Sequence, residues 1–226
     1  MIGVLGFWKL PVFRDPTVSR LLRLVIPMGI ALVFFLALYL SRPYPEFLVL
    51  LGLITAYLLP PAGKESVIPI GIGLGEPWWL IGASTLVMDL CCSLFIALNL
   101  DLALRIPIIG GVIGRFMEGG RGYLDARPWL ERFSYAGLIL FVIIPFQGSG
   151  GVNATILGRI LGFGIGGAVG CVLVGSAVSS FGIALGAGAL LHLFRHDPVW
   201  CAAVVAAAAL LLGVAWCVWR RIAPSP

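Results

Sequence analysis

Three ionisable side chains interrupt long apolar stretches of the sequence and could do chemistry inside a lipid bilayer. Glu65 follows a break rich in proline and glycine, Asp89 lies within the run STLVMDLCCSLF, and Arg159 lies within another apolar run. A charge at the centre of a membrane-spanning helix costs about 2.5 to 3.5 kcal/mol on insertion scales, so such groups are functional candidates. We therefore predict that Glu65 and Asp89 carry a proton or neutralise a bound cation.

The same side chains also have purely structural interpretations. Lys64 and Glu65 would then lie at a shallow, water-filled mouth, and Asp89 would pair with a neighbouring helix. Arg159 would extend to the cytoplasmic interface, as long basic side chains do near helix ends. The sequence leaves both interpretations open.

A second break, near residues 145–151, carries hydrogen-bonding groups without charge. Glycines in such a break expose backbone N–H groups that can hold a phosphate or a lipid headgroup. Alternatively, the polar groups satisfy one another. The predicted substrate or proton site combines the charged candidates with this neutral set and comprises Lys64, Glu65, Asp89, Gln147, Gly148, Ser149, Gly150, Asn153 and Arg159.

The composition indicates an integral membrane protein. Apolar residues make up 60% of the 226 residues, charged residues only 11%, and the mean hydropathy is +1.07. These values exclude a soluble domain. We expect an all-α fold in one transmembrane domain over residues 1–226. The first apolar run ends without a small-residue cleavage site, so we expect it to remain as a span and not to be removed as a signal peptide. We expect no nucleic-acid partner.

The apolar runs predict the elements that position the candidate residues. Four runs have the length that a bilayer core requires, and they cover residues 24–40, 79–100, 164–190 and 199–219. The segments 47–75 and 135–160 each break at proline and glycine, so we predict two helical hairpins. The short run 106–117 is flanked by charges and predicts a helix along the membrane surface.

The two hairpin segments are related by an internal repeat. The stretch 52–67 matches 137–152 at six of sixteen ungapped positions, and Gly73/Gly158 and Gly82/Gly167 extend this offset of 85 residues. A broken helix in lipid must be satisfied by protein or by water in a cavity. Each copy is therefore predicted to contain a hairpin whose break lies inside the protein, followed by a full-length span.

The distribution of basic residues predicts the orientation of the hairpins. Re-entrant hairpins leave Arg42 and Arg195 outside and place the basic N-terminus, the arginine-rich loop 101–134 and the C-terminus in the cytoplasm. This bias satisfies the positive-inside rule, and it disappears if both hairpins cross the membrane. The two copies would then enter from opposite faces, as in the inverted repeats of secondary transporters, whose sites lie near the midplane.

Cysteine and histidine give no strong metal-binding pattern. The five cysteines lie in apolar runs without C-x-x-C spacing, which indicates packing. His192 and His196 are four residues apart and could place two ligands on one helix face, but a loop just outside a span is polar in any case, and we favour this simpler interpretation. We expect neither a metal nor a cofactor.

Both breaks resemble motifs of a known family. The second, Pro145-Phe146-Gln147-Gly148-Ser149-Gly150, resembles the P-x-x-G-[ST]-G signature of the small multidrug export protein family, a distant relative of the DedA and VTT membrane proteins. The first, Pro60 to Ser66, resembles the hairpin tip of DedA proteins. The resemblance covers about residues 47–190. DedA-like proteins are implicated in moving phosphorylated lipid carriers or phospholipids, whereas the family's own label implies drug efflux.

From this resemblance and the predicted site we expect a transporter or translocase of DedA-like architecture, multi-pass in the cell membrane with both termini cytoplasmic. Its expected substrate is an amphipathic, anionic lipid or lipid-carrier phosphate, with proton coupling as an option. The alternative is efflux of small cationic drugs, with Glu65 and Asp89 as counter-charges. An enzyme acting on lipid phosphates is less favoured, because the sequence has no intramembrane histidine and no paired-carboxylate spacing. Membrane lipids are expected partners, and a homo-oligomer is left open.

Overall fold

The structure is a computed structural model that describes residues 16–59, 62–103, 128–144 and 150–200, together with short pieces between 202 and 214. Throughout these residues the fold is all-α, with helices joined by turns and short extended connections. By its internal contacts the chain divides into two units, residues 1–184 and residues 185–226. The candidate residues that the structure describes all lie in the first unit.

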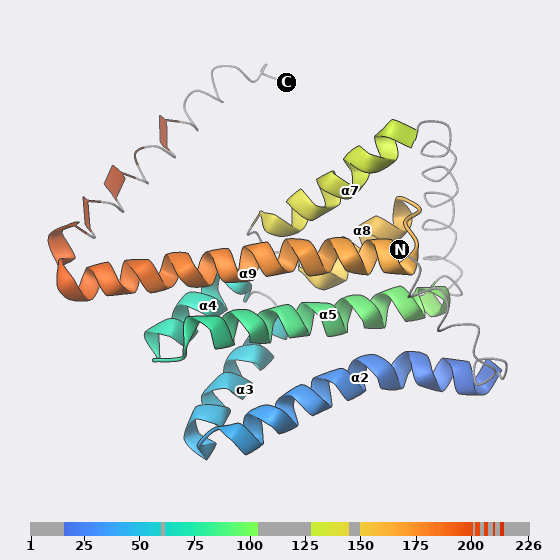
Figure 1. Cartoon of the computed structure of the whole chain (residues 1–226), viewed down its shortest axis with the longest axis horizontal. Coiled ribbons are helices and arrows are strands. Elements are labelled where there is room, and N and C mark those ends of the chain that lie inside the picture. The colour runs from blue at the N-terminus through green and yellow to red at the C-terminus, as the bar shows by residue number, and fades with distance from the viewer. Residues whose placement is uncertain are drawn as a thin grey trace. The chain divides into compact units, whose positions relative to one another are not determined.

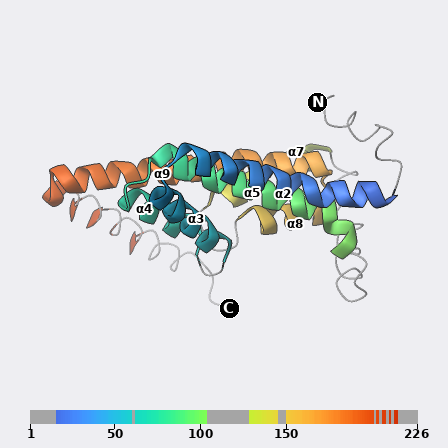
Figure 2. The same cartoon turned by 90° about the horizontal axis from the view of Figure 1, so that it is seen from below.

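Three helices are long and apolar enough to cross a membrane. They are α2 (Pro16–Ser41), α5 (Trp78–Ala103) and α9 (Ile165–His196), and they contain the apolar segments Leu21–Ser41, Trp78–Leu100 and Ile165–His196. In the first unit, α2 and α5 lie side by side, and α9 lies along the other side of α5 (Figures 1 and 2). The predicted spans 24–40, 79–100 and 164–190 thus fall on these helices, while the predicted surface helix 106–117 lies outside the described residues. Only parts of 199–219 are described.

The packing of α2 on α5 compensates for a proline inside α2. Pro27 has no N–H group, so the carbonyl of Arg23, four residues earlier, loses its helical donor. The side-chain amide of Asn99 on α5 donates to this carbonyl at 3.3 Å. A neighbouring helix therefore satisfies the freed backbone group, as an apolar environment requires.

Two successive segments of the chain have the same order of elements. The first is α3 (Tyr44–Leu58), α4 (Lys64–Gly73) and α5, and the second is α7 (Pro128–Ile143), α8 (Gly151–Ile160) and α9. We call α3–α4 and α7–α8 the first and second helical pairs, since the two helices of each pair contact each other. The order of a helix, a short helix and a long helix therefore occurs twice in the described residues.

The short helix of each segment ends in the same turn. Gly75 and Gly162 have φ angles of 100° and 87°, which favour glycine because it lacks a Cβ. In each turn the residue after this glycine donates its N–H to the carbonyl five residues earlier. Glu76 donates to Gly71 and Phe163 donates to Gly158, at 2.9 Å in both cases.

These turns correct the register of the repeat. They are 87 residues apart, so Gly158 corresponds to Gly71 and not to Gly73 as the sequence offset of 85 implied. The reason is the length of the breaks, because five residues separate α3 from α4 and seven separate α7 from α8.

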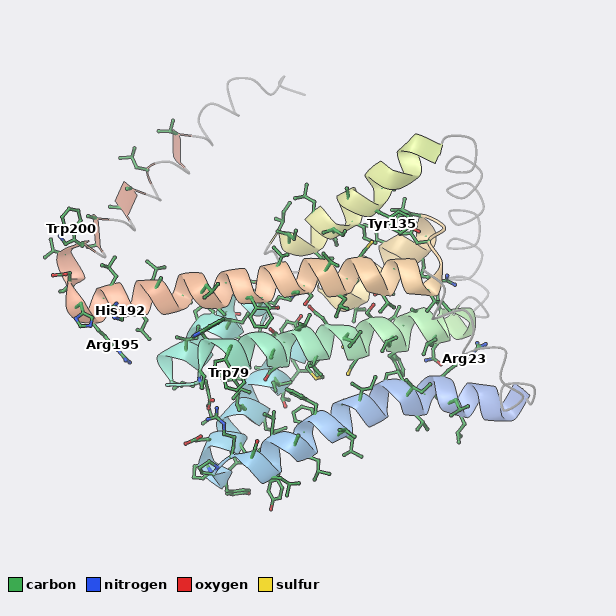
Figure 3. The ribbon with its side chains drawn as sticks, viewed as in Figure 1. Arg23, Trp79, Tyr135, His192, Arg195 and Trp200 are labelled. Atoms are coloured by element: carbon green, nitrogen blue, oxygen red, sulfur yellow. The ribbon has the colours of Figure 1, made fainter. Side chains whose placement is uncertain are left out.

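The second helical pair packs on α9 through an apolar cluster and one close contact at a glycine. Leu138 and Val142 of α7, Ala154 of α8 and Ala168 and Val172 of α9 form one buried cluster. A Cβ built on Gly175 would lie 2.7 Å from the Cβ of Val142, so α9 can approach α7 this closely only at a glycine. Tyr135 of α7, labelled in Figure 3, stacks on Phe163 with ring centroids 4.0 Å apart.

The turn after α4 contains a buried carboxyl group. Glu76 is 7% exposed, and within the described residues its Oε2 atom accepts no hydrogen bond. Burial raises the pKa of this carboxyl above its usual range, the nearby Arg42 partly opposes the shift, and Glu46 adds to it. The charged form of Glu76 therefore destabilises the folded protein.

We expect Glu76→Gln to stabilise the protein at high pH. Because the folded-state pKa is raised, the stabilising contribution of protonation is complete below the unfolded-state pKa and is lost as the pH rises through the folded-state pKa. The melting temperature of Glu76→Gln in detergent should therefore exceed that of the wild type at pH 8 and approach it at pH 4.5. Asp197→Asn, at an exposed position in the second unit, is the control. Parallel pH curves for the wild type and Glu76→Gln would contradict the expectation.

In the second unit, α9 continues to His196. The rings of His192 and His196 lie 4.5 Å apart on this helix, with His192 labelled in Figure 3. Within the described residues, no group of three or more histidine, cysteine, aspartate or glutamate side chains could hold a metal ion.

Candidate functional site

Asp89 is the centre of a buried polar cluster in the first unit. It lies at the middle of the 23-residue apolar segment Trp78–Leu100 of α5 and is 2% exposed. Its Oδ2 atom is 2.6 Å from Lys64 Nζ and accepts a hydrogen bond from the Ser176 hydroxyl, also at 2.6 Å. Its Oδ1 atom accepts from the Tyr57 hydroxyl at 2.5 Å and from the Gly151 N–H at 3.0 Å. One carboxylate thus contacts both helical pairs and α9.

The break between α3 and α4 positions Lys64. Gly63 is the N-cap of α4, its N–H donates to the Ser66 hydroxyl at 3.1 Å, and that hydroxyl donates to the Gly63 carbonyl at 3.0 Å. The first helical residue is Lys64, whose side chain is 7% exposed. Because α4 begins here, the lysine extends from the break toward the middle of α5.

The N-terminus of α8 reaches Asp89 because Gly151 has no side chain. A Cβ built there would lie 2.6 Å from the Asp89 carbonyl oxygen and 3.1 Å from its Cα, and backbone atoms of a helix cannot move aside cheaply. The absence of this Cβ brings the Gly151 N–H within hydrogen-bond distance of the carboxylate. Free N–H groups and the positive end of the helix dipole stabilise a negative charge at such a position.

The cluster continues along one face of α5. Thr85, Asp89 and Ser93 are four residues apart and fully or almost fully buried, so they share this face. The hydroxyl of Thr155 on α8 donates to the Ser93 hydroxyl at 2.6 Å. A line of polar side chains therefore follows α5 through an otherwise apolar interior.

Lys64 and Asp89 carry opposite charges, so the centre as a whole is neutral. Taking two charges out of water is costly, and their attraction compensates only when hydrogen bonds satisfy the remaining atoms. Both atoms of the Asp89 carboxylate and all three N–H groups of Lys64 have partners here. Removing either partner would leave a buried charge without its counter-charge. A ligand that competes for one partner would therefore change the stability of the whole cluster.

The structure brings together only some of the residues predicted from the sequence. Lys64 and Asp89 form the ion pair, and Gly150 lies beside them, since a Cβ there would lie 3.8 Å from Asp89 Oδ1. Glu65 and Asn153 are exposed. The structural interpretation that Asp89 pairs with a neighbouring helix thus agrees with the structure, whereas Lys64 is buried and not at an open mouth.

Arg159 lies at the end of α8, away from the break. It is half-buried, and its guanidinium donates to the Phe163 carbonyl at 2.9 Å, so it stabilises the turn between α8 and α9. Gln147, Gly148 and Ser149 lie outside the described residues. Their predicted role in the site stays a prediction.

Three side chains that bind the Lys64–Asp89 pair were missed from the sequence. Tyr57 lies near the end of α3, just before the first break, and Ser176 and Ser179 lie three residues apart in α9. The spacing of the serines is a usable signal, because residues three apart share a helix face. However, a serine is common in the helix interfaces of membrane proteins, so this spacing alone does not distinguish a site from packing.

These features define a polytopic α-helical membrane protein with a buried ion pair. The chain belongs to the family described as "Putative small multi-drug export protein", whose model matches residues 65–181, more than half of the sequence. The match includes Asp89, Gly151, Ser176 and Ser179 and begins one residue after Lys64. Searches of curated proteins and of solved structures gave no match.

Proposed function

We propose that this protein exports small amphipathic cations, with Asp89 as the counter-charge and Lys64 as an internal cation that occupies the site between transport cycles. The observation that carries the proposal is the Lys64–Asp89 ion pair at 2.6 Å in the middle of α5. A charged group buried at membrane depth marks substrate pathways in transport proteins. The family description names multi-drug export, which is the class of function proposed here.

The relative freedom of the two partners favours a cation over an anion. Asp89 has a short side chain in the middle of a long helix, and three donors other than Lys64 hold it. Lys64 has a long flexible side chain at the first position of α4, directly after a break. Because the lysine can move more easily, opening the pair would expose the carboxylate to an incoming cation.

Movement of an amphipathic anion such as a lipid phosphate is the second candidate. The observation that favours it is the donor set around Asp89, because a lysine, two hydroxyl groups and the N-terminus of α8 could also bind a phosphate. An anion would have to displace the Asp89 carboxylate from all of these donors. For that reason we rank cation export first.

We further propose that the helical pairs are re-entrant hairpins of an inverted repeat in the plasma membrane, with both termini in the cytoplasm. The contacts of α5 support this orientation. Gly71 of α4 packs on Ile81 near the start of α5, whereas Thr155 of α8 binds Ser93 in the second half of α5. The two pairs thus approach Asp89 from opposite ends of the same helix.

Labelling of single cysteines tests this topology. In a cysteine-free background, cysteines at positions 41 and 196 should react with an impermeant reagent from outside, and a cysteine at position 121 only after the membrane is opened. The reason is the positive-inside rule applied to the arginine-rich loop. Reaction of the cysteine at position 121 from outside would contradict the inverted repeat.

Transport in proteoliposomes tests the proposed function. Wild-type protein should move fluorescent amphipathic cations, and Asp89→Asn, compared at equal amounts of folded, reconstituted protein, should abolish this movement because it removes the counter-charge. In parallel, movement of a fluorescent phosphatidic acid between leaflets tests the second candidate, and a pH gradient tests proton coupling. Cation transport that persists in Asp89→Asn would contradict the proposal. Lipid movement without cation transport would favour the second candidate, and release of inorganic phosphate would favour an enzyme.

A further inference from the structure

The contacts of Lys64 Nζ define which kind of cation can take its place. The ammonium group lies 2.6 Å from Asp89 Oδ2 and 3.0 Å from the hydroxyl oxygens of both Ser176 and Ser179. A primary ammonium has three N–H donors and no acceptor. Its three hydrogens therefore match three buried oxygen atoms, which we call the ammonium socket.

The hydroxyl groups of the socket are oriented as acceptors. The Ser176 hydroxyl donates its hydrogen to Asp89 Oδ2 at 2.6 Å, and the Ser179 hydroxyl donates to the Ser176 carbonyl at 3.3 Å. With their hydrogens directed elsewhere, both oxygens present lone pairs to the ammonium. The Oδ1 atom of Asp89 is occupied by Tyr57 and Gly151, so the carboxylate cannot turn to a different partner without losing these bonds.

We infer that the ammonium socket selects primary alkylammonium groups over quaternary ones, and that the exported cations of the proposed function are amphipathic primary amines. That these amines are exported rests on the proposed function, whereas the selectivity of the socket rests only on its contacts with the ammonium group. A quaternary ammonium has the same charge but no N–H group, so it would leave both serine oxygens without a donor. Buried acceptors without donors are costly, and the methyl groups would also hold the nitrogen farther from the three oxygens.

The variant Lys64→Ala tests the socket directly in the purified full-length protein. It removes the internal ammonium together with three methylene groups, a volume that n-propylammonium fills. We expect a lower melting temperature for Lys64→Ala than for the wild type, and its recovery on addition of n-propylammonium. The matched compound trimethylpropylammonium, with the same chain and charge, should require a concentration roughly tenfold higher or more, since it makes no charge-assisted hydrogen bond.

Two control variants separate binding in the socket from a general salt effect. Lys64→Met fills the same space with an apolar side chain, and Lys64→Ala/Asp89→Asn lacks the counter-charge, so n-propylammonium should stabilise neither. If Lys64→Ala is not recovered in folded form, the yield of monodisperse protein solubilised with each compound replaces the melting temperature. Equal effects of the two compounds, or no effect of n-propylammonium on Lys64→Ala, would overturn the inference.

The same experiment distinguishes failure of the inference from failure of the proposed function. Recovery by n-propylammonium in Lys64→Ala, without cation transport by the wild type, would support the socket and contradict export. Transport of quaternary cations by the wild type, together with equal recovery by both compounds, would support export and overturn the selectivity for primary amines.

Discussion

Asp89→Asn should lower the stability of the folded protein more than any other single change at the buried ion pair. The substitution keeps the shape of the side chain but leaves the Lys64 ammonium buried without a counter-charge. Removing one partner of a buried pair typically costs about 3 to 5 kcal/mol. We expect a correspondingly lower melting temperature in detergent and a low yield of monodisperse protein.

Lys64→Met should cost less than Asp89→Asn. After loss of the lysine, the carboxylate keeps three donors, namely Tyr57, Ser176 and the Gly151 N–H, and it stays at the N-terminus of α8. The cost of the remaining buried charge is therefore partly offset. This asymmetry between the two single variants is itself a measurable consequence of the cluster.

The double variant Lys64→Met/Asp89→Asn is the control for both. It contains neither charge, so it should be more stable than Asp89→Asn alone, and the difference reports the coupling between the two side chains. Melting temperatures of the four proteins complete the cycle. A double variant no more stable than Asp89→Asn would show that the two groups are not coupled as the 2.6 Å contact implies. The double variant should remain inactive in cation transport.

Gly151→Ala should disconnect α8 from Asp89. A Cβ at this position would lie 2.6 Å from the Asp89 carbonyl oxygen, so the helix must shift and the hydrogen bond from Gly151 to the carboxylate is lost. Overpacking costs about 1 to 3 kcal/mol and a hydrogen bond to a charged group about 1.5 to 3 kcal/mol, so we expect a loss of about 3 kcal/mol. Thermal unfolding in detergent measures this loss.

The neighbouring Gly150 supplies a matched comparison. A Cβ there would meet the Tyr57 hydroxyl at 3.6 Å and Asp89 Oδ1 at 3.8 Å, which are ordinary van der Waals distances. Its φ angle of −68° suits alanine, so Gly150→Ala should cost only the cap preference, about 1 kcal/mol. If the two alanine variants unfold at the same temperature, the close approach of α8 to α5 does not contribute to stability as described.

The order of elements could be predicted from the sequence because it depends on patterns within one chain segment. Apolar runs of sufficient length predicted α2, α5 and α9, and the prolines and glycines of the two breaks predicted that a short helix precedes α5 and α9. Beyond the breaks, the predicted offset of 85 residues was two residues too small. An ungapped comparison cannot detect that the second break is longer than the first.

The candidate site could be predicted only in part because it depends on contacts between distant segments. Asp89 was found, since a carboxylate in an apolar run is unusual wherever it packs. The sequence ranked Glu65 above its neighbour Lys64, yet the lysine is buried and the glutamate exposed. Adjacent residues at a helix start point in different directions, and only the packing of α4 on α5 decides which one turns inward. The serines of α9 are more than 85 residues from Asp89 in the chain.

The carboxylate of Asp89 also makes the two helical pairs thermodynamically dependent on each other. Its Oδ2 atom binds Lys64 beside the first break and its Oδ1 atom binds the N–H of Gly151 beside the second, although the two atoms belong to a single rigid group. Any molecule that releases the lysine changes the charge felt by α8, and any movement of α8 changes how firmly the lysine is held. By linkage these two effects are equal in free energy. Weaker binding of Asp89 at one break therefore changes its binding at the other through Oδ1, Cγ and Oδ2 of one carboxylate, without a change in the shape of α5.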